Sequence, residues 1–175
     1  MDNGPLRFNA IKDIKACADF VISEKIADPS RIGLLGASYG GYMVMSGLTS
    51  YPNLFAAGAD LYGIVNFETF FKNTEPTMAD ISKTKFGDPD SQRDLLRDLS
   101  PFNKSDKVTA PTIFLHGKND TNVPLNESEQ IFEVLNRKGI PTKLVVFPDE
   151  GHGFLKEENR IQSVLEIISW FKNYL

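Results

Sequence analysis

The sequence predicts an α/β fold in which a mostly parallel sheet of about four strands carries helices on both faces. Short segments that are apolar on both faces recur along the 175 residues, as is typical of strands buried in a parallel sheet. Between them lie longer segments whose apolar residues repeat every three or four positions, the spacing of an amphipathic helix. Strands that alternate with helices in this way build one parallel sheet with helices on both sides. At this length the chain forms one domain, spanning residues 1–175.

The expected elements follow one another along the chain. An apolar stripe at helical spacing predicts a helix over residues 8–26, which ends before Pro29; the stripe consists of Ile11, Ile14, Ala18, Val21 and Ile22. The apolar segments predict strands over residues 31–36, 55–62, 112–117 and 142–147. The remaining periodic segments predict helices over residues 41–50, 94–99, 124–138 and 161–171.

Residues 63–90 are expected to be less regular. Several aromatic residues stand there among Asn, Thr, Pro and Glu, and the segment ends in a turn at residues 87–90. Its position in the chain is where a cap or a pocket wall would fall. The alternative is that its aromatic side chains are ordinary core residues.

Composition excludes several classes of function. The net charge is −4 and no basic run or stripe is present, so we expect no nucleic-acid partner. No apolar segment is long enough to span a bilayer and the first residues do not form a signal peptide, so we expect no membrane association. The single cysteine, Cys17, excludes an intramolecular disulfide and favours a cytoplasmic location; we expect it to pack beside the apolar stripe of the first helix. We expect no metal and no cofactor.

The segment Gly36-Ala37-Ser38-Tyr39-Gly40 joins the first strand to the next helix and matches G-x-S-x-G, the nucleophile elbow. In this sharp turn we expect a Cβ two residues before or after the serine to collide with the backbone, which explains Gly36 and Gly40. The turn exposes the serine hydroxyl, and the helix N-terminus directs the Tyr39 N–H to the same place. The alternative is an ordinary turn of small residues, because so short a pattern also occurs by chance.

A serine nucleophile needs a base and an acid, and both follow later strands. His152 lies between two glycines after the fourth strand, and Asp120 follows the third. The chain order Ser, Asp, His is that of α/β-hydrolases. His116 lies inside a strand end, where we expect a structural ring bonded to nearby backbone. Asp149 and Glu150 are rival acids, which we expect to be solvated turn residues; that pair is too close to the histidine in sequence to reach its ring.

Three segments together resemble the catalytic domain of the prolyl oligopeptidase family of serine peptidases, with the acylaminoacyl-peptidase and dipeptidyl-peptidase branches nearest. They are residues 36–42, residues 116–124 and residues 150–154. The resemblance implies that Ser38 is the nucleophile, Asp120 the acid and His152 the base, with the Tyr39 N–H as an oxyanion donor. It also implies a set of substrate-binding residues, namely Asn122, Val123, Tyr62, Phe67, Phe70 and Phe71.

The resemblance also shows what this sequence lacks. Family members carry a β-propeller or similar domain, together with earlier strands and a second oxyanion donor, and no matching segment occurs here. We therefore expect a partial α/β-hydrolase domain whose strand at residues 31–36, from Arg31 to Gly36, leaves an open apolar edge. We expect a homo-oligomer that covers this edge.

The expected function is that of a serine hydrolase of peptidase ancestry, acting on a peptide or ester substrate through an acyl-enzyme. One alternative is a weak or inactive hydrolase remnant that serves as an oligomeric fold or binding module. The other is a carboxylesterase.

Overall fold

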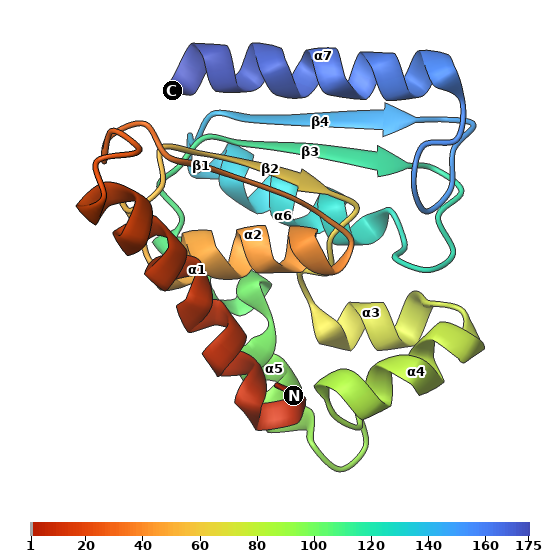
Figure 1. Ribbon diagram of the computed structural model, residues 1–175. Coiled ribbons are helices and arrows are strands. Elements are labelled where there is room, and N and C mark those ends of the chain that lie inside the picture. Colours follow the sequence, from red (N-terminus) through yellow and green to blue (C-terminus); the bar gives the residue numbers. More distant parts are fainter. Residues whose placement is uncertain (1) are drawn as a thin grey trace.

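The computed structural model describes residues 2–175, and its centre is a four-stranded parallel sheet. The strands lie in the order β1 (Gly33–Ala37), β2 (Ala57–Leu61), β3 (Thr112–Gly117) and β4 (Thr142–Phe147), as Figure 1 shows. Every neighbouring pair is parallel. The predicted fold class and the four predicted strands are therefore confirmed.

Helices cover both faces of the sheet (Figure 1). On one face lie α2 (Tyr39–Ser50) and α6 (Asn126–Arg137), with α1 (Arg7–Ser23) packed against α2. On the other face lies α7 (Glu157–Tyr174), which contacts β2 and β3. The short 3-10 helix η1 (Gly4–Leu6) leads into α1.

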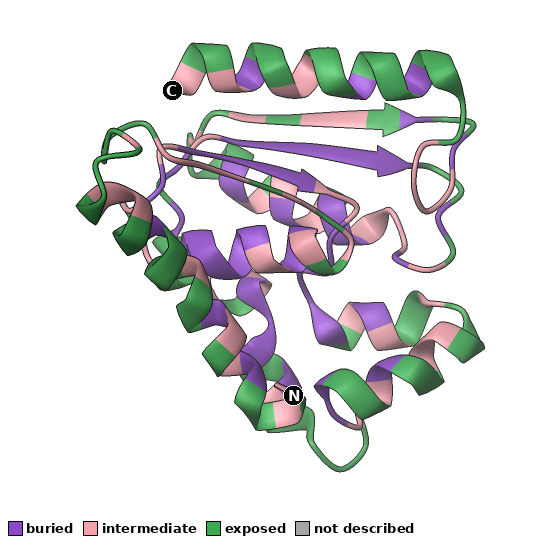
Figure 2. Cartoon of the chain, in the orientation of Figure 1, coloured by how far each residue is buried: buried purple, intermediate pink, exposed green. Residues whose placement is uncertain are grey.

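The core follows the alternation of strand side chains. In β3, Phe114 packs with Met45 and Ile131 on the α2 and α6 side, whereas Ile113 and Leu115 pack with Trp170 of α7. All three β3 side chains are fully buried, and the strand is purple along its whole length in Figure 2. Burial on both faces explains why the strand reads as a continuous apolar run in the sequence.

The expectation of irregular structure over residues 63–90 was wrong. This region forms α3 (Phe67–Asn73) and α4 (Pro76–Phe86), followed by α5 (Arg93–Leu99) and the 3-10 helix η2 (Pro101–Lys107). Asn66 caps α3 by accepting the Glu68 N–H at 3.1 Å, and Pro76 stands at the first turn of α4, where its missing N–H costs nothing. These helices bury an aromatic cluster of their own, which includes Tyr42, Phe67, Phe70 and Phe86.

Cys17 lies beside the apolar stripe of α1, as expected, but it is exposed. Its side chain borders the apolar groove between α1, β1 and α2 together with Ile14, Ala18 and Val21.

No helix within residues 2–175 combines the length and the apolar character needed to cross a membrane.

Candidate active site

Ser38 stands in a strained turn between β1 and α2. Its φ is +56° and its ψ is −116°, a conformation that residues with a Cβ rarely adopt. Its backbone N–H donates to the Leu61 carbonyl at 2.8 Å, which holds the turn against the end of β2. Strain of this kind persists only where the surroundings enforce it.

The prediction that two glycines flank the serine for steric reasons was right at Gly36 and wrong at Gly40. A Cβ on Gly36 would lie 2.3 Å from the Gly40 carbonyl oxygen, whereas a Cβ on Gly40 would meet nothing within 4 Å. The second crowded position is Gly41, where a Cβ would lie 2.2 Å from Asp60 Oδ1. A second tight approach is therefore that of α2 to the end of β2 and the loop that follows it.

The structure brings Ser38, His152 and Asp120 into one hydrogen-bonded chain. His152 Nε2 lies 2.8 Å from Ser38 Oγ, and His152 Nδ1 lies 2.8 Å from Asp120 Oδ2. A carboxylate only accepts, so Nδ1 carries the ring proton, and the unprotonated Nε2 accepts the serine hydroxyl. The three residues lie in loops at the carboxyl ends of β1, β3 and β4, which parallel strands bring to one edge of the sheet.

Asp120 is buried and its carboxylate is fully hydrogen-bonded. Oδ1 accepts the backbone N–H groups of Asn122 and Val123, each at 2.9 Å. Burial raises the pKa of Asp120, but hydrogen bonds from His116, His152 and the Val123 N–H outweigh it and lower that pKa to about 2. The carboxylate is therefore ionised at neutral pH and fixed in position beside the histidine ring.

His116 is fully buried beneath this site, and the prediction that its ring bonds to nearby backbone is confirmed. Nε2 donates to the Val123 carbonyl at 2.8 Å, so Nδ1 accepts the Ser128 hydroxyl at 2.7 Å in the neutral ring. Nε2 also lies 3.5 Å from Asp120 Oδ2. His116 thus ties the acid loop to the start of α6.

The expectation that Glu150 is a solvated turn residue was wrong. Its side chain is buried and accepts the N–H groups of Leu155 and Lys156 at 3.0 and 2.9 Å and the Asn159 amide at 2.8 Å. The Leu155 N–H foremost, with the Asn159 amide and the Lys156 N–H, lowers the pKa of Glu150. Glu150 therefore closes the loop that carries His152. Asp149, its neighbour, is exposed as expected and pairs with Lys156.

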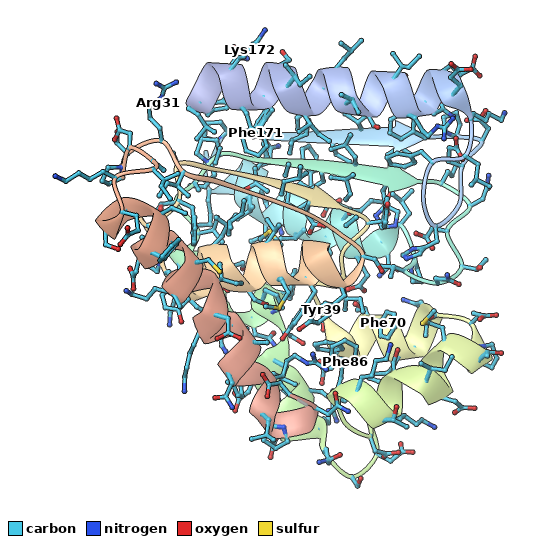
Figure 3. The ribbon with its side chains drawn as sticks, in the orientation of Figure 1. Arg31, Tyr39, Phe70, Phe86, Phe171 and Lys172 are labelled. Carbon is cyan, nitrogen blue, oxygen red and sulfur yellow. The ribbon has the colours of Figure 1, made fainter. Side chains whose placement is uncertain are left out.

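A cavity of about 600 Å³ opens beside Ser38 and His152. Its wall includes the predicted residues Asn122, Val123 and Phe70 together with Tyr39. Figure 3 shows Tyr39 and Phe70 converging with Phe86 on the space between α2, α3 and α4. Tyr39 is the first residue of α2, so no carbonyl within the helix can accept its backbone N–H.

The other aromatic residues predicted to wall this pocket lie behind it or beside it. Phe67 is fully buried against Tyr42 and Phe86, and Phe71 packs at the margin of the same cluster. The Tyr62 ring lies 4.9 Å from the His152 ring, edge to face. Phe67 and Phe71 share one face of α3 with Phe70, but that helix packs its apolar face on α4 and α5, and only Phe70 borders the cavity.

Sequence reasoning missed much of the cavity wall, and Arg7 and Phe86 are two of the residues it missed. Both belong to helices that come near the site only after folding, and no motif marks either residue. Among residues 2–175, no three or more His, Cys, Asp or Glu side chains are grouped so that they could hold a metal ion.

Known proteins share this arrangement of elements. The chain is 34% identical over 152 residues to the dipeptidyl aminopeptidase BIII of Pseudoxanthomonas mexicana, covering 84% of this chain and 22% of that protein. It is 32% identical over 171 residues to the acylamino-acid-releasing enzyme of Arabidopsis thaliana, covering 94% of this chain and 22% of the enzyme. The chain thus spans about a fifth of the length of these curated relatives.

Solved structures agree with the sequence comparison. The acylaminoacyl peptidase of Pyrococcus horikoshii superposes with a TM-score of 0.85 at 28% identity, over 94% of this chain and 27% of that one. A puromycin-hydrolyzing peptidase of Mycobacterium tuberculosis superposes with a TM-score of 0.89 at 26% identity, over 94% of this chain and 25% of that one. A sequence model of the prolyl oligopeptidase family matches residues 4–175. The chain therefore belongs to the prolyl oligopeptidase family of serine peptidases.

Proposed function

We propose that this chain carries the catalytic triad of a serine hydrolase that cleaves peptide or ester bonds through an acyl-enzyme. The observation that carries the proposal is the continuous hydrogen-bonded chain from Ser38 Oγ through the His152 ring to Asp120. An exposed serine without a base is a poor nucleophile, and this arrangement supplies the base in the required tautomer.

Each group has one role in the proposed reaction. Ser38 Oγ attacks the substrate carbonyl carbon while His152 Nε2 takes the hydroxyl proton. The negative charge on the carbonyl oxygen is stabilised by the Tyr39 N–H at the start of α2. His152 then gives its proton to the leaving amine or alcohol, and water hydrolyses the acyl-enzyme by the same steps in reverse order. Asp120, with a pKa of about 2, stays ionised and stabilises the imidazolium that forms between these steps.

The lining of the cavity is suited to a substrate whose acyl part carries a side chain. Its inner wall is apolar, formed by Ile64, Phe70, Met78, Val123 and Phe86, while Asn122 stands near the nucleophile with an amide that can bond a peptide carbonyl. Peptide-like acyl groups fit this combination of one apolar pocket and one amide. A carboxylesterase shares the same triad, so the leaving group distinguishes the two activities.

Intact mass after exposure to a fluorophosphonate tests the proposal. We expect a single adduct on the wild-type chain, none on Ser38→Ala, and an undiminished adduct on the matched control Ser23→Ala, which removes an exposed hydroxyl on α1. A folded wild-type protein without an adduct would contradict the proposal. Turnover of an N-acyl-peptide p-nitroanilide, compared with p-nitrophenyl acetate, then separates peptidase from esterase activity.

We also propose that the chain forms a homodimer over the β1 edge. Within residues 2–175, β1 pairs with β2 on one side only, and Leu35 on this strand is 58% exposed. An apolar groove lined by residues of α1, β1 and α2 runs beside it, including Ile14, Val21 and Leu34. An unpaired strand next to an apolar groove favours association with a second copy. Light scattering at high micromolar concentration should give the mass of a dimer for wild type and of a monomer for Leu35→Lys. The control Leu155→Lys changes another exposed leucine and should remain a dimer. A wild-type monomer would contradict the proposal.

A further inference from the structure

Arg7, the first residue of α1, is a buried cation in the wall of the cavity that contains Ser38. Only 9% of its surface is exposed. Arginine is almost never buried to this extent unless an acidic group pairs with it, because an unpaired charge is costly to remove from water. The environment of this guanidinium therefore indicates whether it has a partner within the fold.

The partners of Arg7 within the described chain are all neutral. Nη1 donates to the Tyr39 hydroxyl at 2.9 Å, and Nη2 donates to Asn3 Oδ1 at 3.1 Å and to the Lys85 carbonyl at 3.2 Å. The guanidinium carbon lies 5.0 Å from the centre of the Tyr39 ring and 5.1 Å from that of Phe86. Nε is buried without a hydrogen-bond partner, and no carboxylate of residues 2–175 lies within 4 Å of the guanidinium.

The cavity connects this cation to the nucleophile. Arg7, Ser38 and His152 line one continuous space, and Tyr39, which bonds the guanidinium, directly follows the serine in the chain. Asp2 and Lys85 are the other charged residues on the wall, so the three formal charges sum to one positive charge. Between the two ends the wall is apolar, which weakens the screening of any charge placed there.

We propose that Arg7 forms an anion subsite that accepts a carboxylate of the substrate, carried on the acidic side chain of the residue whose carbonyl Ser38 attacks. Nη2 already uses both of its N–H groups and Nε is buried, so the second N–H of Nη1 is the donor that is left for a carboxylate. A charge-assisted bond of this kind is stronger than a neutral one. A stem of methylene groups would lie along Ile64 and Phe86 while the carboxylate reaches the guanidinium. This inference rests on the proposed function, since it assumes that the acyl part of the substrate enters this cavity.

A structural role for Arg7 makes a different prediction. If the residue only joins the start of α1 to α2 and α4 through Tyr39 and Lys85, its replacement lowers stability but leaves ligand preference unchanged. Binding of two ligands that differ only in charge separates the two roles. N-acetyl-glutamyl amide and N-acetyl-glutaminyl amide have the same size and differ only in their side-chain terminus, a carboxylate or a neutral amide.

The experiment is isothermal titration calorimetry, in which these two probes are titrated into wild type and variants. The corresponding N-acetyl amides of aspartate and asparagine form a second, shorter pair. We expect wild type to bind the acidic member of at least one pair about 10- to 100-fold more tightly, the range for a hydrogen bond to a charged group. The ratio should fall to about one in Arg7→Gln, survive in part in Arg7→Lys, and remain unchanged in Arg31→Gln, a control that removes an exposed arginine beside Leu175.

Three results would overturn the inference: a ratio near one for both pairs in wild type, an unchanged ratio in a folded Arg7→Gln, or a ratio lost only in Lys85→Gln. A wild-type ratio near one overturns the inference even if Arg7→Gln fails to fold, and Lys85→Gln then decides whether a high ratio depends on the other cation of the wall. Titration does not require turnover. Fluorophosphonate labelling without an acidic preference would refute the subsite and leave the proposed function standing, and an acidic preference without labelling would refute the function alone.

Discussion

Gly41 of α2 and Gly63 of the loop after β2 pack backbone against backbone. A Cβ on either residue would lie 2.7 Å from the Cα of the other, and on each it would also collide with Asp60 Oδ1. We predict that Gly41→Ala lowers the free energy of unfolding by about 1–3 kcal/mol, the usual cost of overpacking, because backbone cannot move aside as a flexible side chain can. Urea unfolding followed by circular dichroism measures the change.

Gly40→Ala is the matched control for that experiment. It adds the same methyl group one residue earlier in the same helix, where nothing lies within 4 Å. Alanine favours helix over glycine by about 1 kcal/mol, so this variant should equal or exceed wild type in stability. Equal destabilisation by both substitutions would show that the crowding at Gly41 is not what requires glycine.

Asp60, whose carboxyl group lies against Gly41 and Gly63, should make the free energy of unfolding depend on pH. Burial raises the pKa of Asp60 to about 7, and its Oδ2 has no hydrogen-bond partner. The folded state keeps this proton up to about pH 7, whereas the unfolded chain releases it near the ordinary pKa of an aspartic acid, 3.8. The stabilising contribution of the protonated carboxyl is therefore complete below about pH 4 and is lost as the pH rises to about 7.

Asp60→Asn removes this dependence, because an amide cannot ionise and its oxygen can still accept the Gly63 N–H. We predict that the stability of the variant relative to wild type increases by roughly 2–4 kcal/mol as the pH rises from 4 to 8. Urea unfolding at a series of pH values, with the exposed Asp106→Asn as control, measures the gain. Parallel stability curves for wild type and Asp60→Asn would contradict the prediction.

Glu127 of α6 anchors the segment that leads into α3. Its fully buried carboxylate accepts the backbone N–H groups of Val65 and Asn66 at 3.1 and 2.8 Å, along with the hydroxyl of Thr69. Glu127→Ala leaves these donors buried without an acceptor, so we predict a loss of about 2–5 kcal/mol in the free energy of unfolding. The control is Glu129→Ala, an exposed position on the same helix, where denaturation should occur at the wild-type urea concentration.

Glu150 should set the reactivity of Ser38 without touching it. Because it holds the backbone of residues 155 and 156, Glu150→Ala frees the loop that carries His152. A small misplacement of a base costs up to about 10²-fold in rate, so we predict a 10- to 100-fold slower labelling of Ser38 by a fluorophosphonate. Asp149→Ala, at the exposed neighbouring position, should label at close to the wild-type rate; equal slowing in both variants would assign the effect to the turn as a whole.

Local pattern was enough to predict the sheet and to place the candidate triad at the ends of its strands. The central strand β3 is buried along its whole length and β2 nearly so, which explains their largely apolar sequences, and a parallel sheet brings the loops after its strands to one edge. Ser38, Asp120 and His152 each follow a strand, and the structure joins them by two hydrogen bonds of 2.8 Å each.

The missed features depend on contacts between distant segments. Glu150 is buried because the chain turns back at Leu155, and Gly41 is crowded because β2 ends beside α2; neither event has a local signal. In residues 67–86 the apolar spacing is helical, but frequent polar residues and Pro76 concealed it, since these two helices bury only part of their surface. Arg7 lies 32 residues from its hydrogen-bond partner Tyr39, too far for any motif to connect them.

The bond between Ser38 and His152 joins residues 114 positions apart. During synthesis, the turn that carries Ser38 leaves the ribosome before β3, the loop with Asp120 and His152 have been made. The nascent chain therefore presents a serine hydroxyl no more reactive than any other until His152 has been translated. Acquisition of reactivity toward a fluorophosphonate would then report the completion of the fold itself, in a single covalent step.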